Sequence, residues 1–266
     1  MLLSLSQSGS KKPKLKYSQS VAESIKKALC EKLDIRPFDY GEPRENEHDY
    51  YKKLIGYLVT KEQLIALNFT GVTDAMVAEL NRVQKKYNIL NMETVRHFLA
   101  QVMQESNNWN KEGLGDAIIE MGDDKYLTRY DGKSGNKSGT DDYKTFRGSG
   151  YLHLTGRYNY QKFSDHIATE YGADPLIMSE GYSRIASTYA WESAGWYWSI
   201  LRPSQGFNLN GISSSSIVTR TVNDNGEMKA VTGSDVVFDV TYNVNGGYNG
   251  IENRMAYYEL VKKVIK

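Results

Sequence analysis

The chain has 266 residues, 40% of them hydrophobic, and a formal net charge of +1 at pH 7. This length and hydrophobic content predict one large domain with its own core and exclude a disordered chain. The near-neutral charge gives no electrostatic reason to expect a nucleic-acid partner, and the single cysteine, Cys30, excludes a fold built on internal disulfides.

The sequence contains no apolar run of about 18 residues, so we expect no segment that inserts into a membrane. The first residues, MLLSLSQSGSKKPKLK, place a short apolar patch before the lysines. A secretory signal has the reverse order and a longer apolar run. We therefore expect a protein that is made in the cytoplasm without a signal peptide.

The N-terminal 48 residues are expected to form an extension of the main domain. Residues 1–16 carry four lysines and no acidic residue, which is typical of a flexible basic tail. Apolar residues recur every fourth position between Tyr17 and Leu33, which predicts a short amphipathic helix. Prolines and a glycine then indicate a linker, with the domain boundary between 37 and 50 and the main domain over 49–266.

Helices are expected to dominate from Asp49 onward. Thr60 is followed three residues later by Gln63, the spacing of a helix-starting capping box. Apolar periodicity predicts further helices from Thr73 to Tyr87 and from Met92 to about Gln104.

The second half of the chain alternates loops and helices. Gly, Asp, Lys and Ser are frequent over 121–150, which indicates a long loop, and helices are expected over Tyr158–Tyr171 and Tyr182–Leu201. The Ser/Thr/Val-rich segment 211–240 predicts a loop or a small β-hairpin, and a last helix begins at Tyr248 or Gly250 and ends at Ile265. The fold class is therefore mainly α.

Glu105 has the sequence context of a catalytic acid. Phe98, Val102 and Glu105 fall on one helical face of HFLAQVMQES. A carboxylate that continues an apolar stripe is costly to bury as an anion, so burial favours the protonated form that a general acid requires. The same pattern also fits a helix that has simply reached solvent.

Four segments in order resemble family 19 glycoside hydrolases, the group of chitinases and phage endolysins. HFLAQVMQES is similar to the helix that holds the family's general acid, and FRGSGYLHLTGRYNY resembles its F-R-G-R-G-x-x-Q-L-T-G-R-x-N-Y core. WESAGWYW resembles the helix of small and aromatic residues that follows, and VNGGYNGIENRMAYY its V-N-G-G-x-N-G-x-x-x-R closing segment. The resemblance covers roughly residues 60 to 266.

The resemblance implies a catalytic set. Glu105 would be the general acid, Glu120 the second carboxylate, and Thr155 would hold the attacking water through its hydroxyl. Glu120 is preferred because EMGDDKYLTRYDGKSGN resembles the bacterial form in which the second glutamate precedes a Y-x-G-R-x-x-L-G-N segment. Glu112 is the rival for this role and Asp116 a more distant one.

The resemblance also implies a set of substrate contacts. Asn159 and Asn245 would hydrogen-bond the sugar or its N-acetyl group, and Tyr126 and His153 would contact the same polymer. Arg254 would lie behind the site and orient the catalytic carboxylates through charge-assisted hydrogen bonds. The family needs no cofactor, and the sole cysteine and the scattered histidines predict no metal site.

The chain departs from the family's pattern at three positions. Ser149 stands where the family has its second arginine, His153 where it has a glutamine, and Asn249 where an acidic residue is common. These changes put the level of activity and the substrate in question more than the fold.

The resemblance implies a two-lobed, lysozyme-like domain that hydrolyses β-1,4 bonds between amino sugars with inversion, using carboxyl groups roughly 6.5 to 9.5 Å apart. Peptidoglycan is the preferred substrate, because the chain has neither the disulfides nor the signal of secreted chitinases. A chitinase, or a catalytically weakened glycan-binding component of a phage-tail-like particle, is the alternative. A wall hydrolase without a signal would need cell lysis, a holin or a phage particle to reach the wall.

Overall fold

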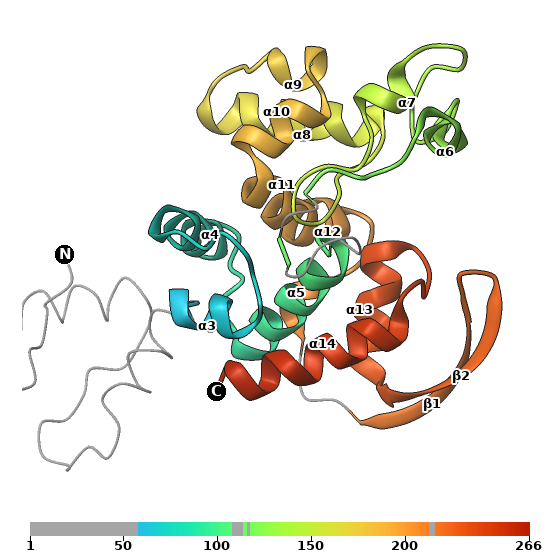
Figure 1. The fold of residues 1–266 in the computed structure, drawn as a ribbon. Helices are drawn as coiled ribbons and strands as arrows, with labels where there is room; N and C mark the ends of the chain where they lie inside the picture. The colour runs from blue at the N-terminus through green and yellow to red at the C-terminus, as the bar shows by residue number, and fades with distance from the viewer. Residues whose placement is uncertain (1–57, 108–113, 116–117, 213–215) are drawn as a thin grey trace, which may run out of the picture. The chain divides into compact units, whose positions relative to one another are not determined.

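The computed structural model describes residues 58–107, 114–115, 118–212 and 216–266. These residues form a mainly helical domain with one two-stranded antiparallel sheet (Figure 1), which confirms the predicted fold class. None of the described helices is long and apolar enough to cross a membrane. The extension predicted over residues 1–48, with its basic tail, helix and linker, lies outside the described residues.

The first three described helices begin at side-chain caps, of which the one at Thr60 was predicted. Helix α3 spans Lys61–Ala66, and the capping box between Thr60 and Gln63 is present. Helix α4 spans Asp74–Lys86, with the side chain of its N-cap, Thr73, accepting a hydrogen bond from the third residue of the helix. Helix α5 spans Met92–Glu105 and is capped by Asn91.

Helix α5 is the central helix of the domain rather than an amphipathic surface helix. Its residues are buried on all sides, including Phe98, Gln101 and Met103. Helix α14, which spans Ile251–Val264, packs along it (Figure 1). Glu105 is therefore the point at which a mostly buried helix ends.

The long loop predicted over 121–150 contains three short helical segments. They are α6 over Asp124–Leu127, the 3-10 turn η1 over Thr128–Tyr130, and α7 over Asp142–Thr145. The Asp123 side chain accepts a hydrogen bond from the backbone N–H of Tyr126 and so starts α6.

The helices after the glycine-rich core segment begin with α8. Helix α8 spans Arg157–Tyr171, close to its predicted bounds. The single helix predicted over Tyr182–Leu201 is wrong, because the chain leaves helical geometry at Tyr189, where φ is −125° and ψ is 22°. The following segments are α9 over Leu176–Ser179, α10 over Tyr182–Thr188, α11 over Ala190–Trp196, the π-helical turn η2 over Tyr197–Leu201, α12 over Arg202–Ser204 and η3 over Leu209–Gly211.

The segment predicted as a loop or hairpin forms a regular hairpin followed by a helix. Strands β1 over Ile217–Asp224 and β2 over Glu227–Ser234 pair directly across the turn. Asn225 and Gly226 have φ of 54° and 92°, the left-handed pair that a tight Asn-Gly hairpin turn requires. The sequence analysis missed helix α13, which spans Asp235–Asn245 and is capped by the Ser234 hydroxyl.

Candidate active site

Glu105 is held in place by a buried arginine from the last helix. Nη2 of Arg254 lies 2.6 Å from Oε1 of Glu105, and the arginine side chain is only 3% exposed. Arg254 also donates to the side-chain oxygen of Gln101, one turn before Glu105 on α5. A charge-assisted contact of this kind fixes the position of the carboxylate. The contact joins α5 to α14 at the end of α5.

Glu120 is held by a separate group of donors. Its Oε1 accepts hydrogen bonds from Nη2 of Arg129 at 2.7 Å, from the Tyr130 hydroxyl at 2.8 Å and from the Tyr126 hydroxyl at 3.4 Å. Its Oε2 accepts one from the backbone N–H of Gly148 at 3.0 Å. This set of donors suits an ionised carboxylate, which only accepts hydrogen bonds.

The tyrosines beside Glu120 are donors rather than bases. Burial, and after it the negative charge of Glu120, raises the pKa of Tyr130 well above its usual range. The same two causes raise the pKa of Tyr126. Both hydroxyls therefore stay protonated near neutral pH. The guanidinium of Arg129 lies 3.7 Å from the centre of the Tyr126 ring, so the cation is stacked on one of these donors.

A short backbone pairing brings Glu120 to the glycine-rich core segment. The backbone N–H of Glu120 donates to the carbonyl of Gly148 at 2.7 Å, and Gly150 donates to the carbonyl of Ile118 at 2.8 Å. Ser149 is fully buried between them, with its hydroxyl bonded to the carbonyl of Tyr182 at 2.8 Å. Ser149 therefore anchors this segment to α10.

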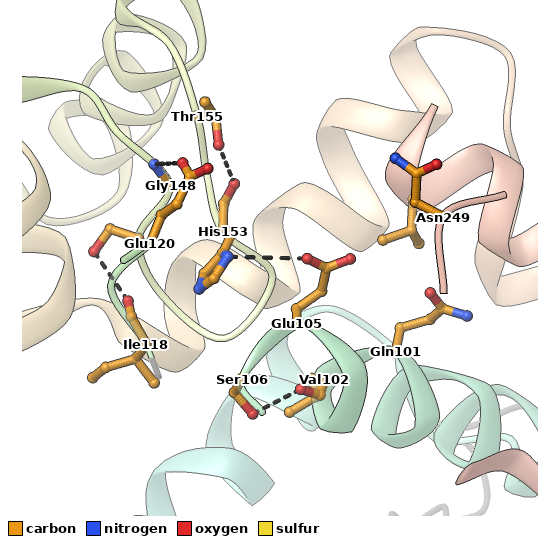
Figure 2. Close-up of polar contacts among 12 residues, drawn as sticks. Gln101, Val102, Glu105, Ser106, Ile118, Glu120, Gly148, His153, Thr155 and Asn249 are labelled. Atoms are coloured by element: carbon orange, nitrogen blue, oxygen red, sulfur yellow. Dashed lines mark hydrogen bonds and ion pairs between the residues drawn. The ribbon is translucent and has the colours of Figure 1, made fainter. Parts of the chain in front are cut away.

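His153 lies between the two carboxylates (Figure 2). Its Nδ1 is 4.0 Å from Oε2 of Glu105. On its other side, a Cβ atom placed on Gly148 would meet both Oε2 of Glu120 at 3.0 Å and Cβ of His153 at 3.1 Å. The His153 backbone has φ of 46°, in the left-handed region that histidine tolerates better than most residues. The histidine side chain thus separates Glu105 from Glu120.

Thr155 and Asn159 brace the turn that leads into α8. The Thr155 hydroxyl donates to the carbonyl of His153 at 2.6 Å (Figure 2). With its proton used in this bond, the hydroxyl oxygen can only accept a hydrogen bond from a water. The Asn159 amide donates to the carbonyl of Thr155 at 2.9 Å. The predicted contacts of these two residues with water and sugar stay predictions.

Asn245 lies away from this group, at the end of α13, where it lines an open groove of about 470 Å³. Asn249 lines the same groove, and its side-chain oxygen accepts a hydrogen bond from the backbone N–H of Asn225 at 3.1 Å. Asn249 therefore ties the hairpin turn at Asn225 to the loop that follows α13.

The structure brings together most of the residues that the sequence proposed, with two differences. Of the two carboxylates, Arg254 contacts Glu105, whereas the predicted contact was with both, and Glu120 has its own cation, Arg129. The sequence analysis did not identify Arg129 or Tyr130, although both lie in the segment that resembles the family. The rivals of Glu120, residues 112 and 116, lie outside the described residues. Within the described ranges no group of three His, Cys, Asp or Glu side chains could hold a metal ion.

Comparison with known proteins gives matches among solved structures alone. No protein-family profile and no curated protein matches the chain. A mutant of chitinase C is similar in structure with a TM-score of 0.45 and 15% sequence identity, over 79% of this chain and 93% of that chain. Chitinase C from Streptomyces griseus HUT6037 is similar with a TM-score of 0.44 and 16% identity over the same shares.

Proposed function

We propose that this protein is a glycoside hydrolase that cleaves β-1,4 bonds between amino sugars with Glu105 and Glu120. One observation carries the proposal: two carboxylates from different segments, each fixed by its own arginine, lie on either side of one histidine. Hydrolysis of a glycosidic bond needs such a pair, with one group as acid and the other as base or nucleophile.

The contacts of each carboxylate suggest its role. Oε1 of Glu105 is bound by Arg254, so Oε2 is the oxygen that would carry the proton to the leaving sugar. Glu120 accepts four hydrogen bonds, so we assign it the role of the ionised base that activates a water. Thr155, whose hydroxyl proton is donated to His153, would accept a hydrogen bond from that water. Attack by a free water inverts the anomeric carbon.

The proposed substrate is the glycan strand of peptidoglycan, and chitin is the alternative. The two polymers share β-1,4-linked N-acetylglucosamine, so the resemblance of the core segments to family 19 enzymes fits either one. The resemblance of the segment after Glu120 to bacterial forms favours peptidoglycan. Action on a wall would make a holin or a phage particle the partner that brings the enzyme to its substrate.

The test compares wild type with Glu105→Gln and Glu120→Gln on purified peptidoglycan and on chitin oligomers. Each substitution keeps the shape of the side chain and should lower the rate by roughly a hundredfold or more. Glu259→Gln, which changes a carboxylate exposed to 55% on α14, is the matched control and should keep full activity. Mass spectrometry of the released fragments identifies the sugar that carries the new reducing end.

Two outcomes would refute parts of the proposal. If wild type and Glu105→Gln are equally inert yet both bind the glycan, the protein is a glycan-binding component rather than a hydrolase. If NMR of the first product shows the β-anomer, the reaction retains configuration and a water between the carboxylates is not the nucleophile.

A further inference from the structure

The open groove beside the hairpin is lined by uncharged residues alone. Those that line it are Thr221, Val222, Asn223, Tyr242, Asn245, Gly246, Gly247, Tyr248 and Asn249. They offer hydroxyl groups, side-chain amides and aromatic rings. Such a surface suits a neutral polar ligand, since none of these nine residues is charged and the neighbouring Arg220, which contacts Tyr248, is paired with Asp239.

The hairpin that forms one wall of the groove is tied to the loop that forms the floor. Oδ1 of Asp224, at the end of β1, accepts hydrogen bonds from the backbone N–H of Gly250 at 2.9 Å and from the side chain of Asn225 at 2.9 Å. The side chain of Asn249 accepts another from the backbone of Asn225 at 3.1 Å. Because Asp224 is only 6% exposed, its two hydrogen bonds are partly shielded from water and hold the wall in place.

Two tyrosines provide an aromatic surface in this groove. The rings of Tyr242 and Tyr248 have centroids 5.6 Å apart and planes inclined by 44°. Tyr242 is 47% exposed on the solvent-facing side of α13, whereas Tyr248 packs partly against the core. A half-exposed ring braced by a second ring can stack on the apolar face of a sugar.

Asn249 links the groove to the candidate catalytic site through a hydrogen bond to Arg254. This residue lines the groove, and its carbonyl accepts a hydrogen bond from Nε of Arg254 at 3.2 Å. The same arginine holds Glu105. Tyr242 and Asn249 line the same groove, so a polymer that lies in the groove and extends along Asn249 would approach Arg254 and Glu105.

We propose that this groove is a distal sugar-binding site, in which Tyr242 stacks on an uncharged N-acetylhexosamine unit of the polymer, remote from the bond that is cleaved. This inference rests on the proposed function for its choice of polymer. A substrate must then extend from Glu105 to Tyr242 on α13 to make both contacts.

The experiment is isothermal titration of N-acetylglucosamine disaccharide and hexasaccharide into the full chain carrying Glu105→Gln, with and without a second substitution. Tyr242→Ala should weaken binding of the hexasaccharide about tenfold and leave the disaccharide unchanged. Tyr242→Phe keeps the ring and should restore hexasaccharide binding. Met228→Ala is the control: it removes a side chain that is 64% exposed on β2, whose residues do not line the groove, and it should have no effect.

The results separate this inference from the proposed function. If Tyr242→Ala keeps the unfolding temperature and also keeps full hexasaccharide affinity, the distal site is refuted, whether or not the wild type hydrolyses glycans. If Met228→Ala weakens binding as much as Tyr242→Ala, the ring has no specific role and the inference is wrong. If hexasaccharide binding depends on Tyr242 while the wild type cleaves neither substrate, the distal site stands and the hydrolase proposal fails.

Discussion

Acid should loosen the contact between α5 and α14 through a single buried histidine. His97 lies eight residues before Glu105 on α5, is 1% exposed, and stacks on Tyr258 of α14 with ring centroids 4.3 Å apart. Neither ring nitrogen has a hydrogen-bond partner among the described residues. Burial, aided by the positive charges of Lys262 and Arg96, lowers the pKa of His97 to about 4.

The size of the effect follows from the two pKa values. In the unfolded chain His97 takes up a proton as the pH falls through 6.5, whereas in the folded protein it does so only near pH 4. The unfolded state therefore binds more protons in this range, so stability is greatest above pH 6.5 and declines as the pH falls. A separation of about 2.5 pH units corresponds to about 3 kcal/mol of unfolding free energy, lost between pH 6.5 and about 4.

The perturbation is His97→Phe, which keeps a ring against Tyr258 and removes the titrating group. Urea unfolding at a series of pH values from 6.5 down to 4 should show the variant losing about 3 kcal/mol less than the wild type. The Glu105–Arg254 pair lies on the same two helices, so the proposed glycan hydrolysis should also survive lower pH in the variant. Parallel stability curves for the two proteins would refute the reasoning.

Two further predictions concern the position of Glu120. Tyr130→Phe removes one of its hydrogen bonds and leaves Arg129 and Gly148, so the rate constant kcat should fall roughly tenfold with little change in unfolding temperature; an unchanged kcat would show that this hydroxyl does not position the carboxylate. Gly148→Ala places a Cβ 3.0 Å from Oε2 of Glu120 and should lower kcat about tenfold or more by displacing it; normal kinetics in a folded variant would contradict the assigned role of Glu120.

The elements that the sequence predicted well are those with local causes. Thr60 and Gln63 form their capping box, and a hairpin forms within 211–240, where a loop or small hairpin was predicted, because a few neighbouring residues determine each geometry. The same holds for the ends of the last helix, whose apolar positions repeat regularly. The local pattern predicted only Glu105 as a catalytic residue. The other residues of the candidate site came from the resemblance over four segments.

The features that were missed depend on contacts between distant segments. Helix α13 is rich in β-branched valines, which favour strands, and its helical form depends on the Ser234 cap and on packing against the core. The break at Tyr189 coincides with a hydrogen bond from its hydroxyl to Asp174, fifteen residues earlier. Periodicity carries no information about such partners. The donors around Glu120 escaped notice for the same reason, since Gly148 is 28 residues away.

The left-handed backbone at position 153 restricts what the protein can place between its two acids. With φ at 46°, asparagine, aspartate and glycine are the substitutes that this geometry accepts most readily, and valine, isoleucine and threonine are strongly disfavoured. Only a few side chains can therefore replace His153 between Glu105 and Glu120. This limit is set by the backbone conformation at position 153 and not by the polarity that the site requires.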